Sequence, residues 1–309
     1  MEQSAGESVP NRGLETAGIQ GGVGSMNTMR FTVADMGIEV LSNYPLSASS
    51  WDAFASKDSA SADFTYHCLL SSELPPLAEA PSVRRYFDDV KNRVYAITQE
   101  RETSMTVHLS QENLPWGTEL MQLYEQLALP HALLLHSKLL IHASYILTDR
   151  GAIAFTAPSG TGKSTQAELW RQHRDALIVN GDRCVVGLRE NAAFAYGYPA
   201  SGSSTDCRNI TAPLRAIVAL KQAKSNAVRS FSGAQAVRVL VNGCYLPKEY
   251  RADLPAIMQT AIELAGSVPI LELSCLPDES AVCVLEDYLR RMENGTGAAR
   301  LGQSSKGER

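Results

Sequence analysis

The first third of the chain carries short hydrophobic runs separated by polar, turn-rich segments, a pattern typical of strands. Ser, Ala and Asp are frequent in the segments between the runs. The expected strands are residues 30–33, 38–41, 64–70, 94–98 and 105–109. The pattern therefore predicts a small β-rich (α+β) N-terminal domain over residues 29–115.

A break at residues 114–117 ends this pattern, and residues 120–135 then show the apolar spacing of a helix, interrupted at Pro130. We expect a helical connector at residues 116–138. From residue 139 onward strands and helices alternate, which predicts an α/β domain over residues 139–292. Its expected strands are 152–156, 176–179, 184–186, 194–196, 216–220 and 270–273, and its expected helices begin near residue 166 and cover 253–264 and 278–291.

Both ends of the chain are polar and rich in small residues. We expect residues 1–28 to be a disordered leader, or an over-extended start before Met26 or Met29, and residues 293–309 to be a disordered tail. The leader lacks the basic-then-apolar layout of a signal peptide, which favours a cytoplasmic protein. No apolar run approaches the roughly 20 residues of a membrane helix, so no membrane partner is expected.

Charge and cysteine content narrow the class of protein further. The formal net charge is −5, and no Lys/Arg-rich stripe with interleaved aromatic residues is present, which disfavours a nucleic-acid partner. The six cysteines contain no C-x-x-C pair and no histidine at zinc spacing, so reduced core thiols are expected. Cys207 differs from the others because it lies in a polar loop next to Arg208.

Residues 157–165, Ala-Pro-Ser-Gly-Thr-Gly-Lys-Ser-Thr, match a phosphate-binding loop of the Walker A kind, except that Ala157 stands at the first glycine position. Glycine lets backbone N–H groups turn toward an anion where a Cβ would intrude. The lysine supplies charge for the β- and γ-phosphates, and the following hydroxyl is a ligand for Mg²⁺. An apolar strand before the loop and a helix after it complete the required order. A glycine-rich turn that matches by chance is the alternative. The expected nucleotide-binding residues are Ser159, Gly160, Thr161, Gly162, Lys163, Ser164 and Thr165.

Three further features near this loop are candidates for chemistry. Asp182 follows an apolar strand downstream of the loop helix. A carboxylate at this position can hold Mg²⁺ together with Ser164, or it can accept a proton from an attacking hydroxyl. The alternative is that Asp182 is an exposed turn residue without a function. His142 lies on an apolar run ahead of the loop strand, where a lone histidine is more often a hydrogen-bonded core residue than a catalyst. The polar segment 196–209, with Ser203, Ser204 and Arg208, suits a loop that closes over phosphate or acceptor, or an ordinary surface loop.

Together these residues resemble a known family. The stretches 141–142, 159–164 and 178–183 look like the catalytic domain of HPr kinase/phosphorylase, and more closely like the HPr-kinase-like proteins with the phosphoenolpyruvate carboxykinase (PEPCK) type of nucleotide-binding fold. The resemblance implies a P-loop domain of that fold, ATP and Mg²⁺ as cofactors, Asp182 as the metal-binding or proton-accepting carboxylate, Lys163 on the phosphates, and His142 beside the transferred phosphoryl group.

Two departures from the family qualify the expected function. Gly181 stands where the family has the first of two adjacent acids, and the Glu-x-Arg-Gly motif of true HPr kinases is missing, which disfavours HPr as substrate. The expected function is an ATP-dependent kinase, an HPr-kinase-like phosphotransferase, acting on a serine-like hydroxyl of a small molecule, peptide or protein. A nucleotide-binding regulatory or assembly protein is the first alternative. Phosphoryl transfer from another donor, such as pyrophosphate, is the second.

Overall fold

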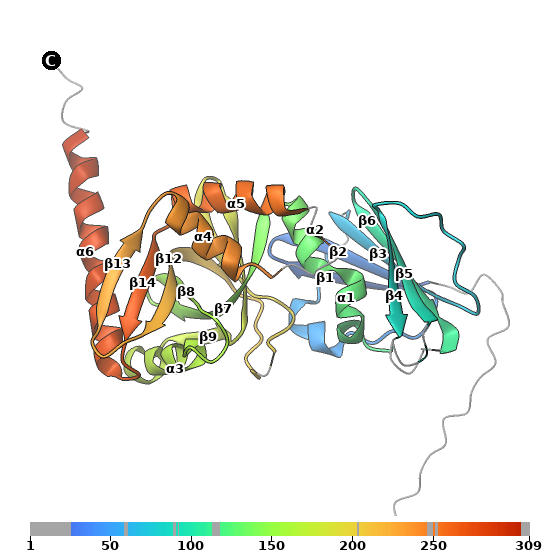
Figure 1. The fold of residues 1–309 in the computed structure, drawn as a ribbon, viewed down its shortest axis with the longest axis horizontal. Coiled ribbons are helices and arrows are strands. Elements are labelled where there is room, and N and C mark those ends of the chain that lie inside the picture. Colours follow the sequence, from blue (N-terminus) through green and yellow to red (C-terminus); the bar gives the residue numbers. More distant parts are fainter. Residues whose placement is uncertain are drawn as a thin grey trace, which may run out of the picture.

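The computed structural model describes residues 26–58, 61–88, 91, 93–112, 118–202, 204–245, 250 and 253–303. The expected leader lies almost wholly outside these residues, and so does Ser203. The described chain forms a mixed α/β protein with two sheets at opposite ends of its long axis, joined by a helical segment (Figure 1).

The N-terminal sheet has six strands in the order β1-β2-β3-β6-β5-β4. Strands β2, β3 and β6 run parallel, and the outer pairings are antiparallel. Sequence analysis missed β4, in which only Tyr86 is buried, because an exposed edge strand carries little hydrophobic pattern. The strands are β1 (Asn27–Val33), β2 (Met36–Ser42), β3 (Phe64–Ser71), β4 (Val83–Asp88), β5 (Arg93–Arg101) and β6 (Ser104–Ser110), and a 3₁₀ helix, η1 (Ser49–Phe54), follows β2.

The connector forms three short helical pieces, η3 (Leu120–Leu123), α1 (Tyr124–Leu127) and α2 (Leu129–Leu135). The predicted interruption at Pro130 is wrong. The break falls at Ala128, which has a positive φ of 43°, and Pro130 lies in the first turn of α2, where its missing N–H breaks no helical hydrogen bond. The connector packs into the same hydrophobic core as the N-terminal sheet.

The second sheet contains the candidate phosphate loop and has the order β11-β10-β7-β8-β12-β14-β13, with β9 paired to β7. Because β11 also pairs with β12, five of these strands close into a ring. Strands β8, β12 and β14 are parallel, as expected for an α/β core. The strands are β7 (Lys138–Thr148), β8 (Gly151–Thr156), β9 (Leu177–Asn180), β10 (Arg183–Arg189), β11 (Ala192–Tyr196), β12 (Thr211–Gln222), β13 (Ala227–Phe231) and β14 (Ile270–Cys275).

Helices cover both faces of this sheet (Figure 1). The helices α4 (Ala234–Gly243) and α5 (Leu254–Ser267) share one apolar core with it, and α3 (Lys163–Arg174) and α6 (Glu279–Gln303) share another. The end predicted for the last helix, at residue 291, is wrong: α6 runs to Gln303, into the segment expected to be disordered.

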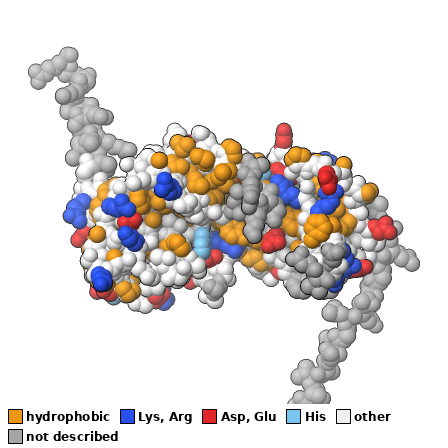
Figure 2. All heavy atoms as spheres, in the orientation of Figure 1, with side chains coloured by type: hydrophobic (Ala, Val, Ile, Leu, Met, Phe, Trp, Pro, Cys, Tyr) orange, Lys and Arg blue, Asp and Glu red, His pale blue; other side chains and the backbone are white. Residues whose placement is uncertain are grey.

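The surface over the α4–α5 layer carries several hydrophobic side chains (Figure 2). On α5, Leu254, Met258 and Ile262 are about half exposed and recur every fourth residue, so they lie along one face of the helix. None of the helices among the described residues combines the length and the low polarity needed to cross a membrane.

Candidate active site

The phosphate loop joins the buried strand β8 to the first turn of α3, as the motif requires. Gly160 and Gly162 have φ of 77° and 114°, values that residues with a Cβ rarely adopt. A Cβ at either position would meet no atom within 4 Å, so the backbone conformation, and not crowding, is what requires glycine here. The Gln166 N–H donates to Gly162 O over 2.9 Å and closes the first turn of α3. The helix therefore directs its remaining N-terminal N–H groups toward the loop.

Lys163 lies under this loop with 7% of its surface exposed, and its Nζ donates to Ala157 O over 3.0 Å. Burial lowers the pKa of Lys163, and the negative charge of Asp182 opposes that effect. Among the other residues of the motif, Ser159, Gly160, Ser164 and Thr165 are exposed. The loop thus presents an open, polar surface around one buried ammonium group.

His142 and Asp182 form a hydrogen-bonded pair beside the loop. His142 Nε2 lies 2.8 Å from Asp182 Oδ1, and both side chains are partly exposed. Strand β7 carries His142 next to β8, and its backbone is tied on both sides: Thr156 Oγ1 donates to His142 O, and Ala143 N donates to Asp182 O. Asp182 lies in the turn between β9 and β10, and both of these strands pair with β7, so this turn and β7 hold the carboxylate and the imidazole against each other.

The buried Asn180 shapes the turn that presents Asp182. Its Oδ1 accepts hydrogen bonds from Asp182 N and Arg183 N at 3.0 and 2.9 Å. Its Nδ2 donates to Tyr198 O and Ala200 O, in the segment after β11. Asn180 thereby links the Asp182 turn to the polar segment expected to close over the site.

Gly181 has a steric reason to lack a side chain. A Cβ at this position would lie 2.4 Å from Ser204 Oγ and 2.6 Å from Ser204 Cβ. Gly202, with a φ of 58°, packs in the same way against Asp182, since a Cβ there would lie 2.6 Å from Asp182 Oδ2. Ser204 therefore occupies the space that a side chain at position 181 would need.

Ser204 and Arg208, the other described candidate residues of the polar segment 196–209, have different surroundings. Ser204 contacts Gly181, as described above. Arg208 donates from Nε to Ile178 O over 3.3 Å and lies 3.7 Å from Asp206, so its guanidinium is engaged along β9. The Cys207 thiol donates to Tyr198 O, and burial raises its pKa, which argues against a reactive thiolate.

Two hollows flank the phosphate loop. One, with a volume of about 420 Å³, is bordered by Thr165, Gln166, Gln222 and Leu276. The amide of Gln166 is 2% exposed, and among the described residues its Oε1 has no hydrogen-bond donor. The other hollow, of about 390 Å³, is bordered by His142, Pro158, Leu220, Val239, Asn242 and Gly243. The loop thus separates one cavity that contains a buried amide from another that contains the His142 side chain.

Sequence analysis missed Asn180, Arg183 and Gln166 as parts of the site. Sequence analysis gave Asn180 no role of its own, although an Asn side chain commonly accepts a hydrogen bond from the backbone two residues further on, as Asn180 does from Asp182 N. Gln166 lies three residues after the motif lysine on the first turn of α3, a position that the local spacing could have indicated. The surroundings of Arg183 are formed by residues from distant segments of the chain, and no local sequence pattern indicates such contacts.

Comparison with known proteins gives limited information. No protein-family model matches the chain, and no curated protein matches it. Among solved structures, the chain is similar to one titled "Structure of the Hpr(Ser) kinase/phosphatase from Coxiella burnetii", with 10% identity and a TM-score of 0.36. The similarity covers 55% of this chain and 99% of the other. This similarity defines neither the family nor the activity of this chain.

Proposed function

We propose that this chain is an ATP- and Mg²⁺-dependent phosphotransferase with a PEPCK/HPr-kinase-like nucleotide-binding domain, which transfers the γ-phosphoryl group to a hydroxyl of a small molecule or peptide. The observation that carries this proposal is the position of the His142–Asp182 pair beside the phosphate loop. Asp182 is close enough to Lys163 for its charge to act on the lysine pKa. Phosphoryl transfer requires groups that bind the phosphates and, close to them, a group that accepts the proton of the attacking hydroxyl.

The residues of the loop have separate roles in this proposal. The N–H groups at the head of α3 and the Lys163 ammonium bind the phosphate oxygens and offset their charge. Ser164 Oγ and Asp182 are the oxygen donors available for Mg²⁺, which typically takes one or two carboxylates and keeps water and phosphate oxygens as its other ligands. When bound, that ion supplies further neutralisation of the charge on the β- and γ-phosphates.

The acceptor hydroxyl must lose its proton as it attacks. In the proposed reaction the hydroxyl oxygen bonds to the γ-phosphorus, the bond from that phosphorus to the β–γ bridging oxygen breaks, and ADP leaves. Asp182 and His142 share a hydrogen bond, so a proton accepted by either can be stabilised by the other. The cavity bordered by His142 is the space for the acceptor next to this pair.

A second candidate function is a nucleotide-binding regulatory or assembly protein without efficient chemistry. The observation that favours it is the contact between Gly181 and Ser204, because it leaves no room for the second acid of the resembled family. In this case Asp182 alone faces the phosphates, and nucleotide occupancy acts as a signal.

The test measures MgATP binding and ADP formation with the full chain, with serine, threonine and a mixed peptide pool as acceptors. The variants are Lys163→Ala and Asp182→Asn, and Lys57→Ala, an exposed lysine in the N-terminal domain, is the matched control. We expect acceptor-dependent ADP in the wild type and the control, and at least a hundredfold loss in the other two. ATP binding without ADP for any acceptor would favour the regulatory candidate, and equal turnover by Lys163→Ala would refute the phosphotransferase.

A further inference from the structure

Arg183 lies next to the candidate active site in an aromatic frame. It is the first residue of β10 and pairs in register with His142 on β7, so the two side chains leave the same face of the sheet. Its guanidinium carbon lies 4.7 Å from the ring centroid of Tyr124, 5.2 Å from that of Tyr245 and 5.9 Å from that of Tyr198. Three rings from three separate segments thus hold one cation in place.

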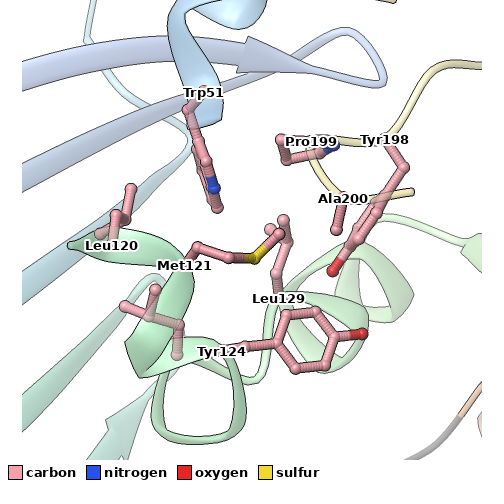
Figure 3. Close-up of a pocket in the computed structure, with 9 residues that line it drawn as sticks. Trp51, Leu120, Met121, Tyr124, Leu129, Tyr198, Pro199 and Ala200 are labelled. Carbon is pink, nitrogen blue, oxygen red and sulfur yellow. The ribbon is translucent and has the colours of Figure 1, made fainter. Parts of the chain in front are cut away.

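The aromatic frame itself is packed firmly. Tyr124 meets Tyr198 and Tyr245 edge to face, with centroids 6.5 and 5.8 Å apart. Tyr124 and Tyr198 also border a small apolar cavity with Trp51 and Met121, which belong to the N-terminal domain and the connector (Figure 3). The frame is therefore anchored by both parts of the molecule, and the guanidinium plane has little freedom.

The hydrogen-bonding capacity of Arg183 is largely unused. Its side chain is 18% exposed, and its nearest acidic atom is Asp182 Oδ2, 3.5 Å from Nε. Among the described residues no acceptor forms a hydrogen bond with the guanidinium. Arginine has five N–H donors in a planar fork, and no nitrogen of Arg183 is among the fully buried, unpartnered polar atoms of the described residues, so its donors are open to solvent or to a ligand. A planar, fixed and underused guanidinium is suited to bind a carboxylate from outside the chain.

Arg183 is also close to the cavity assigned to the acceptor. Asp182 contacts His142 through Oδ1 and Arg183 through Oδ2, so a single carboxylate separates the two side chains. Asn242 and Gly243 border the cavity, and the chain then continues along β7: Cys244 pairs with Ile141, and Tyr245 N donates to Leu140 O. The same short segment therefore passes from the wall of the cavity to the ring that covers Arg183.

From this arrangement we propose that Arg183, in the frame of Tyr124, Tyr198 and Tyr245, binds a carboxylate of the phosphoacceptor, so that the substrate is a small hydroxy acid. The proposal rests on the phosphotransferase function above. The acceptor hydroxyl lies at the His142–Asp182 pair, and the carboxylate, on a neighbouring carbon, forms a bidentate pair with the guanidinium. Pro158, Leu220 and Val239 form an apolar part of the cavity wall, which suits an aliphatic remainder.

The first arm of the test measures binding alone, so that it does not depend on catalysis. D-glycerate, L-lactate and L-serine are each compared with the corresponding primary amide, by isothermal titration into the full chain saturated with Mg²⁺ and a non-hydrolysable ATP analogue. We expect at least one acid to bind at least tenfold more tightly than its amide. If no acid binds better than its amide, the proposal is overturned.

The second arm tests the residue. Arg183→Met removes the donors but keeps a flexible side chain among the rings, and Arg183→Lys keeps the charge without the fork. Arg189→Met is the matched control, because Arg189 is also on β10 and lies over an aromatic ring, that of Phe194. We expect the preference for the acid to disappear in Arg183→Met, to weaken in Arg183→Lys and to persist in the control. An unchanged preference in Arg183→Met would overturn the proposal.

ADP formation, measured in parallel with ATP, separates this proposal from the function on which it rests. Selective, Arg183-dependent binding of an acid without ADP would refute the phosphotransferase and leave the carboxylate site. Equal turnover of acids and amides would establish the phosphotransferase and refute the carboxylate site.

Discussion

The buried His131 joins three parts of the chain, and its protonation should control stability. On α2, its Nε2 lies 2.5 Å from Glu100 of β5 and its Nδ1 2.5 Å from Asp253, which precedes α5. Its ring packs on Tyr250 with centroids 4.6 Å apart, and the side chain is only 6% exposed. A histidine between two carboxylates donates from both nitrogens only when it is protonated.

The pKa of His131 gives the size of the effect. Burial lowers this pKa, but the hydrogen bonds and charges of Asp253 and Glu100 outweigh burial and raise it to about 9 from 6.5. Each tenfold change in proton affinity is worth about 1.4 kcal/mol, so the protonated form contributes about 3 kcal/mol to the free energy of unfolding. Because the folded pKa is the higher one, this contribution is complete below pH 6.5 and is lost as the pH rises through 9.

The assay is urea unfolding followed by tryptophan fluorescence from pH 5.5 to 9.5, with the wild type compared with His131→Gln. The window lies above the titration of Glu100, whose pKa is lowered, so this carboxylate stays charged throughout. We expect the wild type to be more stable than the variant at pH 5.5 and this difference to shrink by about 3 kcal/mol by pH 9.5. Other groups titrate in both proteins and cancel in the difference.

The control is His136→Gln, a substitution of an exposed histidine at the end of the same helix. It should keep the pH dependence of the wild type. A stability difference between wild type and His131→Gln that stays constant across the whole window would refute the reasoning, because it would mean that His131 does not change its proton affinity on folding.

Two further predictions concern the packing of Gly181 and the buried amide of Gln166. Gly181→Asp should lower the free energy of unfolding by about 1–3 kcal/mol in thermal or urea unfolding, because the new Cβ collides with Ser204. Adding Ser204→Gly to this variant should restore most of the lost stability. A single Gly181→Asp variant as stable as the wild type would contradict the steric argument. Gln166→Leu should raise the Kd of MgATP about fivefold in titration calorimetry while leaving inorganic triphosphate binding unchanged, because the buried amide oxygen is available to a donor of the nucleoside. Equal loss for both ligands would place Gln166 on the phosphates instead.

The local parts of the site could be predicted from the sequence, and the distant ones could not. The order of strand, loop and helix follows from spacing within nine residues, and the structure has it, although α3 begins at Lys163 and not near residue 166. The frame of Arg183 depends on Tyr124, Tyr198 and Tyr245, which come together only when the connector, the segment after β11 and the segment after α4 pack on β10. No periodicity within one element encodes such a contact.

The elements that were missed share a physical reason. Helix α4 is rich in β-branched valine, so its helix propensity is low, and packing on the sheet stabilises it. Strand β13 is mostly exposed and lacks a hydrophobic face. Tertiary contacts decided both elements, and a local pattern does not report them.

The closed ring of strands also has a consequence for how this protein could diversify. Strands β11 and β12 pair with each other, and Gly197 N donates to Ile210 O, so the segment between them leaves and re-enters the sheet at nearly the same point. Insertions in a loop with joined ends cost little free energy, because closure entropy grows slowly with length. Exchange of this one loop would therefore change the surface beside Asp182 while β8, the candidate phosphate loop and α3 stay intact, which makes it a suitable segment to vary in directed evolution of the proposed function.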